Sequence, residues 1–365
     1  MKVVNVGLLG LGTIGTGVVK MLLGSGKYLA DKVGVELKLT RIAEKDLGRP
    51  KKVGVPQKLV TDDAQAVLND PDVHVIVELV GGYHPAKEFI LTALSRGKDV
   101  VTANKALLAL HGTELFRKAR EVGRSISFEA SVGGGIPIIA AVRDGFVANR
   151  IQAIYGIVNG TCNYILTKMS REGMSYKAAL AEAQAHGYAE KDPTLDVDGT
   201  DSTHKLAVLG RLGFGVDFDY EAIHREGISD VEFDDMRYAA ELGYTLKLLA
   251  IAKQHPNGLE LRVHPTLLPK DHPLAAVSGV FNAICVNGDA VGETMLYGRG
   301  AGQMPTASAV TADLVDVALG RARTTFEHMR FFSNRRRKAT VLDMAETKCR
   351  YYLRFSALDK PGVLS

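Results

Sequence analysis

Acidic residues crowd a short segment in the second half of the sequence and are followed by a lysine. Residues 188–205 read YAEKDPTLDVDGTDSTHK, and Asp201 and Lys205 lie four residues apart on one face of a predicted helix start. A lysine held beside carboxylates can transfer a proton, but the same spacing occurs in ordinary surface ion pairs, and residue types alone leave both interpretations open. A calcium loop of the EF-hand type does not fit, because Gly199 has the wrong offset and no closing glutamate follows.

A second lysine follows a short predicted strand in the first third of the chain. The strand covers residues 99–102, and the sequence TANK ends on Lys105. Ligands of open parallel α/β sheets bind at the carboxyl ends of the strands, so Lys105 is expected near the nicotinamide end of a bound dinucleotide. An exposed lysine at the start of a helix would give the same pattern.

A glycine-rich turn near the N-terminus indicates dinucleotide binding. Residues 10–15 read GLGTIG between a predicted strand at 3–9 and a predicted helix at 16–23, which is the context that G-x-G-x-x-G requires. The glycines let a pyrophosphate approach the backbone, and the helix N-terminus supplies N–H donors. The residues expected to bind the dinucleotide are Gly10, Leu11, Gly12, Thr13, Ile14 and Gly15.

Two opposing signals bear on which dinucleotide binds. Glu44 follows the second predicted strand and is placed to accept a hydrogen bond from a ribose 2′-hydroxyl, which favours NAD. Basic residues directly beyond it could meet a 2′-phosphate, which favours NADP; these are Lys45, Arg49, Lys51 and Lys52. The sequence therefore predicts NAD or NADP.

Alternating strands and helices must position these groups. Strands are predicted at 3–9, 37–43, 73–80, 99–102 and 125–129, with helices at 16–23, 85–95 and 106–121. Such alternation is typical of βαβ units and a parallel sheet. The predicted fold class is α/β, with residues 1–130 forming an N-terminal Rossmann domain built on a doubly wound parallel sheet.

The rest of the chain predicts an α/β catalytic and dimerisation domain over residues 131–320. It opens with a glycine-rich turn at 132–137 and a strand at 152–158, and helices are predicted at 163–170, 175–186, 202–212, 235–255 and 306–319. Residues 321–348 are polar and predict a linker. Its basic run at 335–338 has no interleaved aromatic residues, which favours a solvated segment over a nucleic-acid site.

Composition excludes several classes of protein. The formal net charge of +4 over 365 residues gives no nucleic-acid-binding field. The three cysteines form neither a disulfide framework nor a zinc pattern, and no apolar run approaches the length of a membrane span. We expect a cytoplasmic protein that acts on a small molecule and has neither nucleic acid nor membrane as a partner.

Several segments, taken together and in order, resemble the homoserine dehydrogenase family. They are GLGTIG at 10–15, ELVGG at 78–82, VTANKALLA at 101–109, FEASVGGGIPII at 128–139, NGTCNYIL at 159–166 and GYAEKDPTLDVDGTDSTHKLAVL at 187–209. The resemblance implies reversible, NAD(P)-dependent interconversion of L-homoserine and L-aspartate 4-semialdehyde in threonine, methionine and isoleucine biosynthesis. It also implies a homodimer or a homotetramer.

The same resemblance implies roles for individual residues. Lys205 would be the general acid and base, and Lys105 its partner near the substrate and the nicotinamide. Glu190, Asp201, Asp196, Gly187 and Tyr188 would bind the substrate. Thr102, Lys105, Gly187, Glu190 and Gly302 would bind the cofactor together with the glycine-rich turn and Glu44. A monovalent cation, usually sodium, would be held largely by main-chain oxygens at Glu129, Val132, Gly134 and Ile136.

Two lysines in one closed pocket are expected to disfavour each other's charge, so that a lysine pKa falls below its ordinary value of about 10.4.

Two other functions remain open: another NAD(P)-dependent semialdehyde or imine reductase, and a non-catalytic NAD(P)- and amino-acid-sensing regulatory protein, which has no use for paired lysines. Residues 349–365 resemble the first strand and turn of an ACT domain. Because that module is incomplete, we expect no inhibition by threonine.

Overall fold

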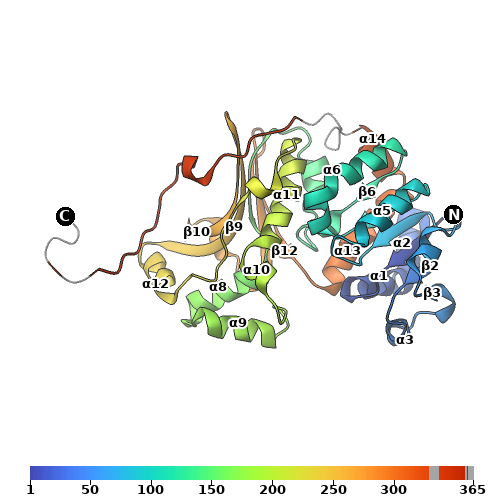
Figure 1. Cartoon of the computed structure of the whole chain (residues 1–365), viewed down its shortest axis with the longest axis horizontal. Helices are drawn as coiled ribbons and strands as arrows, with labels where there is room; N and C mark the ends of the chain where they lie inside the picture. Colours follow the sequence, from blue (N-terminus) through green and yellow to red (C-terminus); the bar gives the residue numbers. More distant parts are fainter. Residues whose placement is uncertain (329–336, 358–359, 361–365) are drawn as a thin grey trace.

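Two β-sheets lie side by side in the chain, each covered by helices (Figure 1). The computed structural model describes residues 1–328, 337–357 and 360. The first sheet has the strand order β3-β2-β1-β4-β5-β6, and the second has the order β12-β11-β7-β9-β10-β8. The α/β fold class predicted from the sequence is therefore confirmed.

The N-terminal sheet is parallel at every pairing of its strands. Its strands are β1 (Lys2–Leu9), β2 (Val35–Ala43), β3 (Val60–Thr61), β4 (Val75–Glu78), β5 (Asp99–Thr102) and β6 (Ile126–Ser127). The helices among them are α1 (Thr13–Gly24), α2 (Gly26–Val33), α3 (Gly48–Val53), α4 (Ala64–Leu68), α5 (Ala86–Ser95) and α6 (Lys105–Glu121). This order is that of a Rossmann domain, in which ligands bind beyond the carboxyl ends of the strands.

Helices from two distant parts of the chain cover the two faces of this sheet. Helices α4, α5 and α6 pack on one face. Helix α1 packs on the other together with α13 (Gln303–Ala318), which comes from near the end of the described chain. The chain therefore returns to the nucleotide-binding unit after it has built the second sheet.

The second sheet is antiparallel except where β10 meets β8. Its strands are β7 (Ile151–Ile157), β8 (His224–Arg225), β9 (Tyr244–His255), β10 (Gly258–Pro269), β11 (Phe281–Gly288) and β12 (Gly292–Arg299). Its helices are α7 (Ile138–Ala140), α8 (Gly160–Glu172), α9 (Tyr176–Ala185), α10 (Thr194–Val197), α11 (Thr200–Phe214) and α12 (Phe233–Glu241). Buried side chains of α8 and α11 share one core with those of α5 and α6.

The helix predicted over residues 235–255 is wrong in its second half. Helix α12 ends at Glu241, Gly243 has a left-handed φ of 84°, and residues 244–255 form strand β9. Every residue from 246 to 252 is buried, because β9 lies inside the sheet with apolar cores on both faces. Apart from Lys247 these residues are apolar, and such a run fits a buried strand or a buried helix equally well by periodicity.

The segment predicted to be a linker begins with a helix. Helix α14 (Arg321–His328) is fixed to the Rossmann sheet by Arg323, which pairs with the buried carboxylate of Asp99, and by the buried ring of Phe326. Further on, Leu342 donates its N–H to the Leu259 oxygen at 2.8 Å, so residues 340–342 run beside the start of β10, while Lys338 and Ala339 pair with Asp217. Part of the ACT-like segment, residues 358–359 and 361–365, lies outside the described residues.

Candidate active site

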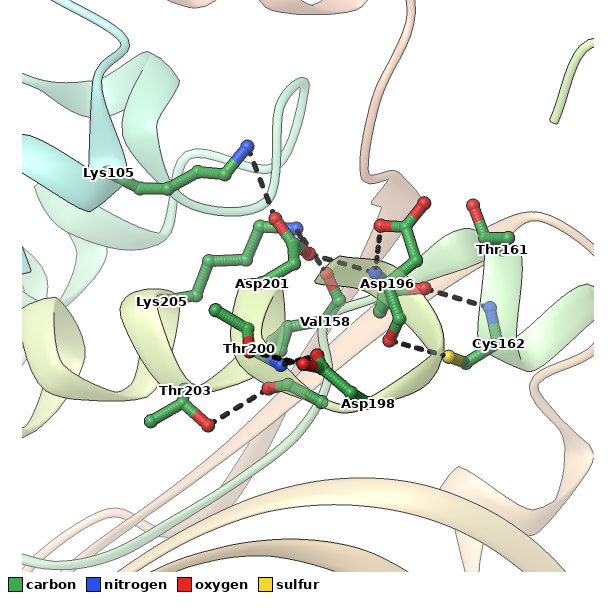
Figure 2. A network of polar contacts seen from close by, with 12 residues as sticks. Lys105, Val158, Thr161, Cys162, Asp196, Asp198, Thr200, Asp201, Thr203 and Lys205 are labelled. Carbon is green, nitrogen blue, oxygen red and sulfur yellow. Dashed lines mark hydrogen bonds and ion pairs between the residues drawn. The ribbon is translucent and has the colours of Figure 1, made fainter. Parts of the chain in front are cut away.

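The polar groups predicted from the sequence meet where the two units face each other (Figure 2). Helix α6 begins at Lys105, α11 carries Asp201 in its first turn and Lys205 in its second, and α10 contributes Asp196. The carboxyl end of β7 leads into Val158 and Asn159. Lysines from two units and carboxylates from two helices thus surround one point.

Lys205 is held in the interior by two oxygen atoms. Its side-chain Nζ donates to the main-chain oxygen of Val158 at 2.6 Å and to Asp201 Oδ2 at 2.6 Å, and the residue is only 9% exposed. Asp201 and Lys205 are therefore not the exposed surface pair that their spacing also permitted. The ammonium is fixed in direction, as a proton-transfer group must be.

Lys105 reaches the same carboxylate from the nucleotide-binding unit. Its Nζ lies 3.2 Å from Asp201 Oδ1, and its side chain is 40% exposed. The negative charge of Asp201 raises the pKa of Lys105 above its ordinary value. The expected fall in lysine pKa is therefore wrong for Lys105, because Asp201 lies between the two ammonium groups and cancels their repulsion.

Asp201 is buried between these two cations. Burial by itself raises the pKa of a carboxyl group, but the charges of Lys205 and Lys105 and the hydrogen bonds outweigh burial and hold the pKa of Asp201 well below its usual range. Its position in the first turn of α11 adds the favourable partial charge of a helix N-terminus. The site therefore keeps a permanent negative charge beside its lysines.

Asn159 is a site residue that the sequence analysis did not single out. Its Nδ2 donates to Asp196 Oδ1 at 2.8 Å and to Asp201 Oδ2 at 2.9 Å. Burial raises the pKa of Asp196, and the bond from Asn159 opposes that rise. The residue belongs to the quoted NGTCNYIL segment, so its place directly after a strand and before a helix was a usable signal.

The residues of the GYAE segment lie on the outer side of the site. Glu190 is exposed, and its charge contributes to the raised pKa of Lys105. The ring of Tyr188 is partly exposed and stacks on His186, while its main-chain oxygen accepts a bond from Thr161 Oγ1 at 2.6 Å. Gly187 has a left-handed φ of 72°. Among the described residues, Glu190 therefore acts on Lys105 through its charge, and no hydrogen bond or ion pair joins these three residues to the two lysines.

The glycine-rich turn and Glu44 are brought together at the ends of β1 and β2. Glu44 Oε2 accepts the main-chain N–H of Leu11 at 2.6 Å. Gly10 has a φ of 92°, and a Cβ there would lie 2.7 Å from the Leu79 oxygen, so only glycine fits. Arg49 stands 3.8 Å from Glu44 Oε1 with half its side chain exposed. Both signals for cofactor choice therefore occupy one location.

A buried acid that the sequence analysis also missed connects the loops after β4 and β5. Glu78 Oε1 accepts the N–H of Val80 at 2.8 Å, and Oε2 accepts the hydroxyl of Thr102 at 2.7 Å. Asn104 caps α6 through Leu107 N–H, and its Nδ2 donates to the Gly82 oxygen at 2.7 Å. Thr102 is thus bonded to Glu78, which holds the loop after β4. Together with the bonds of Asn104, this contact fixes the start of α6, where Lys105 lies.

Gly302 precedes α13, the helix that packs on α1. The neighbouring Gln303 accepts a bond from Lys20 of α1 at 3.3 Å, which places Gly302 on the side of the glycine-rich turn. The structure thus brings Gly302 toward the nucleotide end rather than toward Asp201.

The predicted cation-binding residues form one buried turn. The carboxylate of Glu129 accepts the N–H groups of Ile139 and Ala140 at 2.9 and 2.8 Å, at the start of α7. Gly134 has a φ of 52°, and a Cβ there would lie 2.5 Å from the Gly300 oxygen. Within the described residues, the main-chain oxygens of Val132 and Gly134 accept no hydrogen bond, whereas that of Ile136 accepts one from Ile138. Two free buried oxygens fit a hard cation, although no cluster of three or more His, Cys, Asp or Glu residues occurs in the described chain.

Two family models match the chain and divide it between them. Residues 10–129 match the model described as "Homoserine dehydrogenase, NAD binding domain", and residues 137–315 match the model described as "Homoserine dehydrogenase". With the Rossmann sheet and the lysine–carboxylate site, these matches define an NAD(P)-dependent oxidoreductase.

Relatives specify the oxidoreductase further. The homoserine dehydrogenase of Pseudomonas aeruginosa is 47% identical over 100% of this chain and 84% of its own length. That of Bacillus subtilis is 48% identical over 87% of this chain and 73% of its own length. The crystal structure of a homoserine dehydrogenase from Thiobacillus denitrificans has a TM-score of 0.90 and 45% identity, covering 94% of this chain and 80% of that one. The chain belongs to the homoserine dehydrogenase family, and this membership favours that function over the semialdehyde or imine reductase and the non-catalytic sensor.

A more distant relative is known in complex with its cofactor. A hyperthermophilic archaeal homoserine dehydrogenase in complex with NADPH has a TM-score of 0.74 and 30% identity, covering 87% of this chain and 98% of that one. Among the residues described here, no helix has the length and apolar character needed to cross a membrane.

Proposed function

We propose that this chain interconverts L-homoserine and L-aspartate 4-semialdehyde with Lys205 as the proton-transfer group. The observation that supports the proposal is the fixed ammonium of Lys205, 2.6 Å from both Val158 O and Asp201 Oδ2. These partners take two of its three N–H directions, and the third is left for a substrate oxygen. Reduction of the aldehyde takes a proton from Lys205, and oxidation of the alcohol returns a proton to it.

The substrate's own charges suit the groups around Lys205. The ammonium of homoserine would lie against the carboxylates of Asp201, Asp196 and Glu190, with Gly187 and Tyr188 bordering it. Lys105, partly exposed and paired with Asp201, would face the substrate and the nicotinamide from the other unit. A bound nicotinamide dinucleotide accepts or returns the hydride.

The cofactor is NAD or NADP, bound by residues 10–15, Glu44, Thr102, Lys105, Gly187, Glu190 and Gly302. Support comes from the bond of Glu44 to Leu11 and the position of Arg49 beside it. A ribose 2′-hydroxyl would use the carboxylate, and a 2′-phosphate would use the guanidinium. We propose that the site accepts both cofactors.

The buried turn at residues 129–136 is proposed to bind sodium through main-chain oxygens of Glu129, Val132, Gly134 and Ile136. The unbonded oxygens of Val132 and Gly134 support this assignment. Such an ion would stabilise the turn and its contact with Gly300, and the proposed proton transfer does not involve it.

We also propose a division of the chain into domains and an oligomeric state. Residues 1–130 would be the cofactor domain, 131–320 the catalytic and dimerisation domain, 321–348 a connection and 349–365 the start of an ACT domain. Met295 and Tyr297 are exposed on the edge strand β12, which supports a homodimer or homotetramer. We place the protein in the cytoplasm, with no nucleic acid as a partner.

Replacement of Lys205 by methionine tests the proposed function. The Lys205→Met change removes the proposed proton-transfer group and should lower kcat by about 10²- to 10⁴-fold, both for oxidation of homoserine and for reduction of the semialdehyde. Cofactor affinity should stay within about twofold, because the glycine-rich turn lies in the other unit. Lys118→Met, on the surface of α6, is the control and should keep wild-type kcat. A folded Lys205→Met enzyme with near-normal kcat would return Lys205 to a structural role.

A further inference from the structure

Asn159 stands between a helix and two carboxylates. It follows β7 and is the N-cap of α8, where its Oδ1 accepts the main-chain N–H of Cys162 at 2.8 Å. The residue is 5% exposed. An asparagine at this position is favoured by capping alone, so any further role has to come from the other half of its amide.

The cap determines which way the amide points. Because Oδ1 must face the N–H of Cys162, the Nδ2 group is turned to the acids, 2.8 Å from Asp196 Oδ1 and 2.9 Å from Asp201 Oδ2. The two donor hydrogens of Nδ2 match these two acceptors. A rotated amide would set an oxygen against two carboxylates and would lose the cap as well.

We propose that Asn159 is a positioning residue that holds the carboxylates of Asp196 and Asp201 side by side, so that both are available to the ammonium of the substrate. This inference rests on the proposed function of the Lys205 site. Without a shared donor, two acids packed in one buried place repel each other and separate or share a proton. With it, they keep a fixed spacing and both remain acceptors.

The charges that face these acids come from several elements. Asp201 faces Lys205 and His204 of its own helix and Lys105 of α6, and it receives Asn159 from the end of β7. Asp196 of α10 faces Asp201, Lys205 and Lys105 as well as Asn159. Both lysines have their Nζ atoms close to Asp201 rather than Asp196. The negative charge of Asp196 therefore depends more than that of Asp201 on the hydrogen bond from Asn159.

Two substitutions of Asn159 separate its capping of α8 from its hydrogen bonds to Asp196 and Asp201. Asn159→Ser keeps a capping oxygen but is too short to reach the carboxylates. Asn159→Asp also keeps the cap and places a third carboxylate against the first two. Both remove hydrogen bonds that favour the charged acids, so both raise the pKa values of Asp196 and Asp201, and the aspartate raises them more.

The measurements are the pH profile of kcat/KM for homoserine and the dissociation constant of NADP(H). We expect kcat/KM at pH 7 to fall about 30-fold in Asn159→Ser, equal to about 2 kcal/mol at 1.36 kcal/mol per tenfold. Most of the loss should lie in KM. The acid limb should move to higher pH in both variants, further in Asn159→Asp, with cofactor affinity unchanged.

Ser175→Ala is the matched control, because Ser175 caps α9 through Ala178 N–H and touches none of the acids. It should leave both the pH profile and kcat/KM at wild-type values. If Asn159→Asp does not fold, Asn159→Ser carries the test, since it adds no charge.

The outcomes separate this inference from the proposed function. An unshifted acid limb with kcat/KM within about threefold of wild type in Asn159→Ser would overturn the positioning role, even if Lys205→Met is inactive. A Lys205→Met enzyme with normal kcat overturns the proton-transfer role proposed for Lys205 instead. A shifted acid limb in the Asn159 variants, with an inactive Lys205→Met, supports both.

Discussion

The guanidinium of Arg211 donates a hydrogen bond to the main-chain oxygen of Ala109 and so joins α11 to α6. These two helices carry Lys205 and Lys105 near their N-terminal ends. Asp217 strengthens the junction, because its Oδ1 accepts from Arg211 at 2.9 Å and its Oδ2 from Thr113 of α6 at 3.2 Å. The spacing of the two lysines around Asp201 therefore depends on a contact about one turn along α6 from Lys105 and between one and two turns along α11 from Lys205.

Arg211→Met should loosen this junction. It removes one partner of a largely buried ion pair, and we expect a loss of about 3 kcal/mol in the free energy of unfolding. The KM for homoserine should rise several-fold, because Lys105 is no longer held against Asp201. Urea unfolding and steady-state kinetics measure the two effects. Arg237→Met, at an exposed pair with Asp234, should leave the free energy of unfolding nearly unchanged; equal losses in both variants would show that the junction has no special role.

Asp201→Asn should weaken substrate binding more than it slows the reaction. The neutral amide leaves the ammonium groups of Lys205 and Lys105 without their shared anion and removes the proposed partner of the homoserine ammonium. We expect the KM for homoserine to rise about 10- to 100-fold, as for a lost hydrogen bond to a charged group. Asp192→Asn, exposed on the same loop, is the control. An unchanged KM in Asp201→Asn would mean that the substrate ammonium binds elsewhere.

Both dinucleotides should support activity. Glu44 and Arg49 favour different riboses from the same location, so we expect a preference between NAD and NADP smaller than about a thousandfold, or about 4 kcal/mol. Arg49→Ala should raise the KM for NADP about tenfold and leave that for NAD nearly unchanged. Arg41→Ala removes an exposed cation of β2 that pairs with Asp70 and should affect neither. Equal effects of Arg49→Ala on both cofactors would contradict the assignment.

His204 should make the protein less stable in mild acid. The ring is 7% exposed and stacks on Tyr220, and burial lowers the pKa of His204 from 6.5 to about 4. Below pH 6.5 the imidazole of His204 binds a proton in the unfolded chain but stays neutral in the folded chain. The free energy of unfolding therefore falls as the pH drops from 6.5 to about 4, and this group does not affect it above pH 6.5. Melting temperatures at pH 7 and pH 5 measure the effect. His204→Phe keeps the stacked ring but cannot titrate, and its decrease in Tm should be smaller by several degrees; an equal decrease would show that His204 titrates normally.

Several elements could be predicted closely from local pattern. Strand β5 coincides with the predicted 99–102, and α13 lies within a few residues of the predicted 306–319. The strand is marked by a short β-branched run, and the helix by a long stretch with helical periodicity of its apolar residues. Strands β9 to β12 were missed; for β9 and β11 the reason is that a strand buried on both faces has no alternation to reveal it.

The sequence by itself predicted a dinucleotide site at residues 10–15 and, with the family resemblance, a role for Lys105, Asp201 and Lys205 in the chemistry. Each of these signals is local, because a glycine turn, a strand end and an i,i+4 pair depend only on neighbouring residues. Only the tertiary structure decided that Asp201 lies between the two lysines and raises the pKa of Lys105. It also decided that Asn159 joins Asp196 to Asp201. Electrostatic effects depend on distance through space and on burial, and both arise only when helices from separate units pack together.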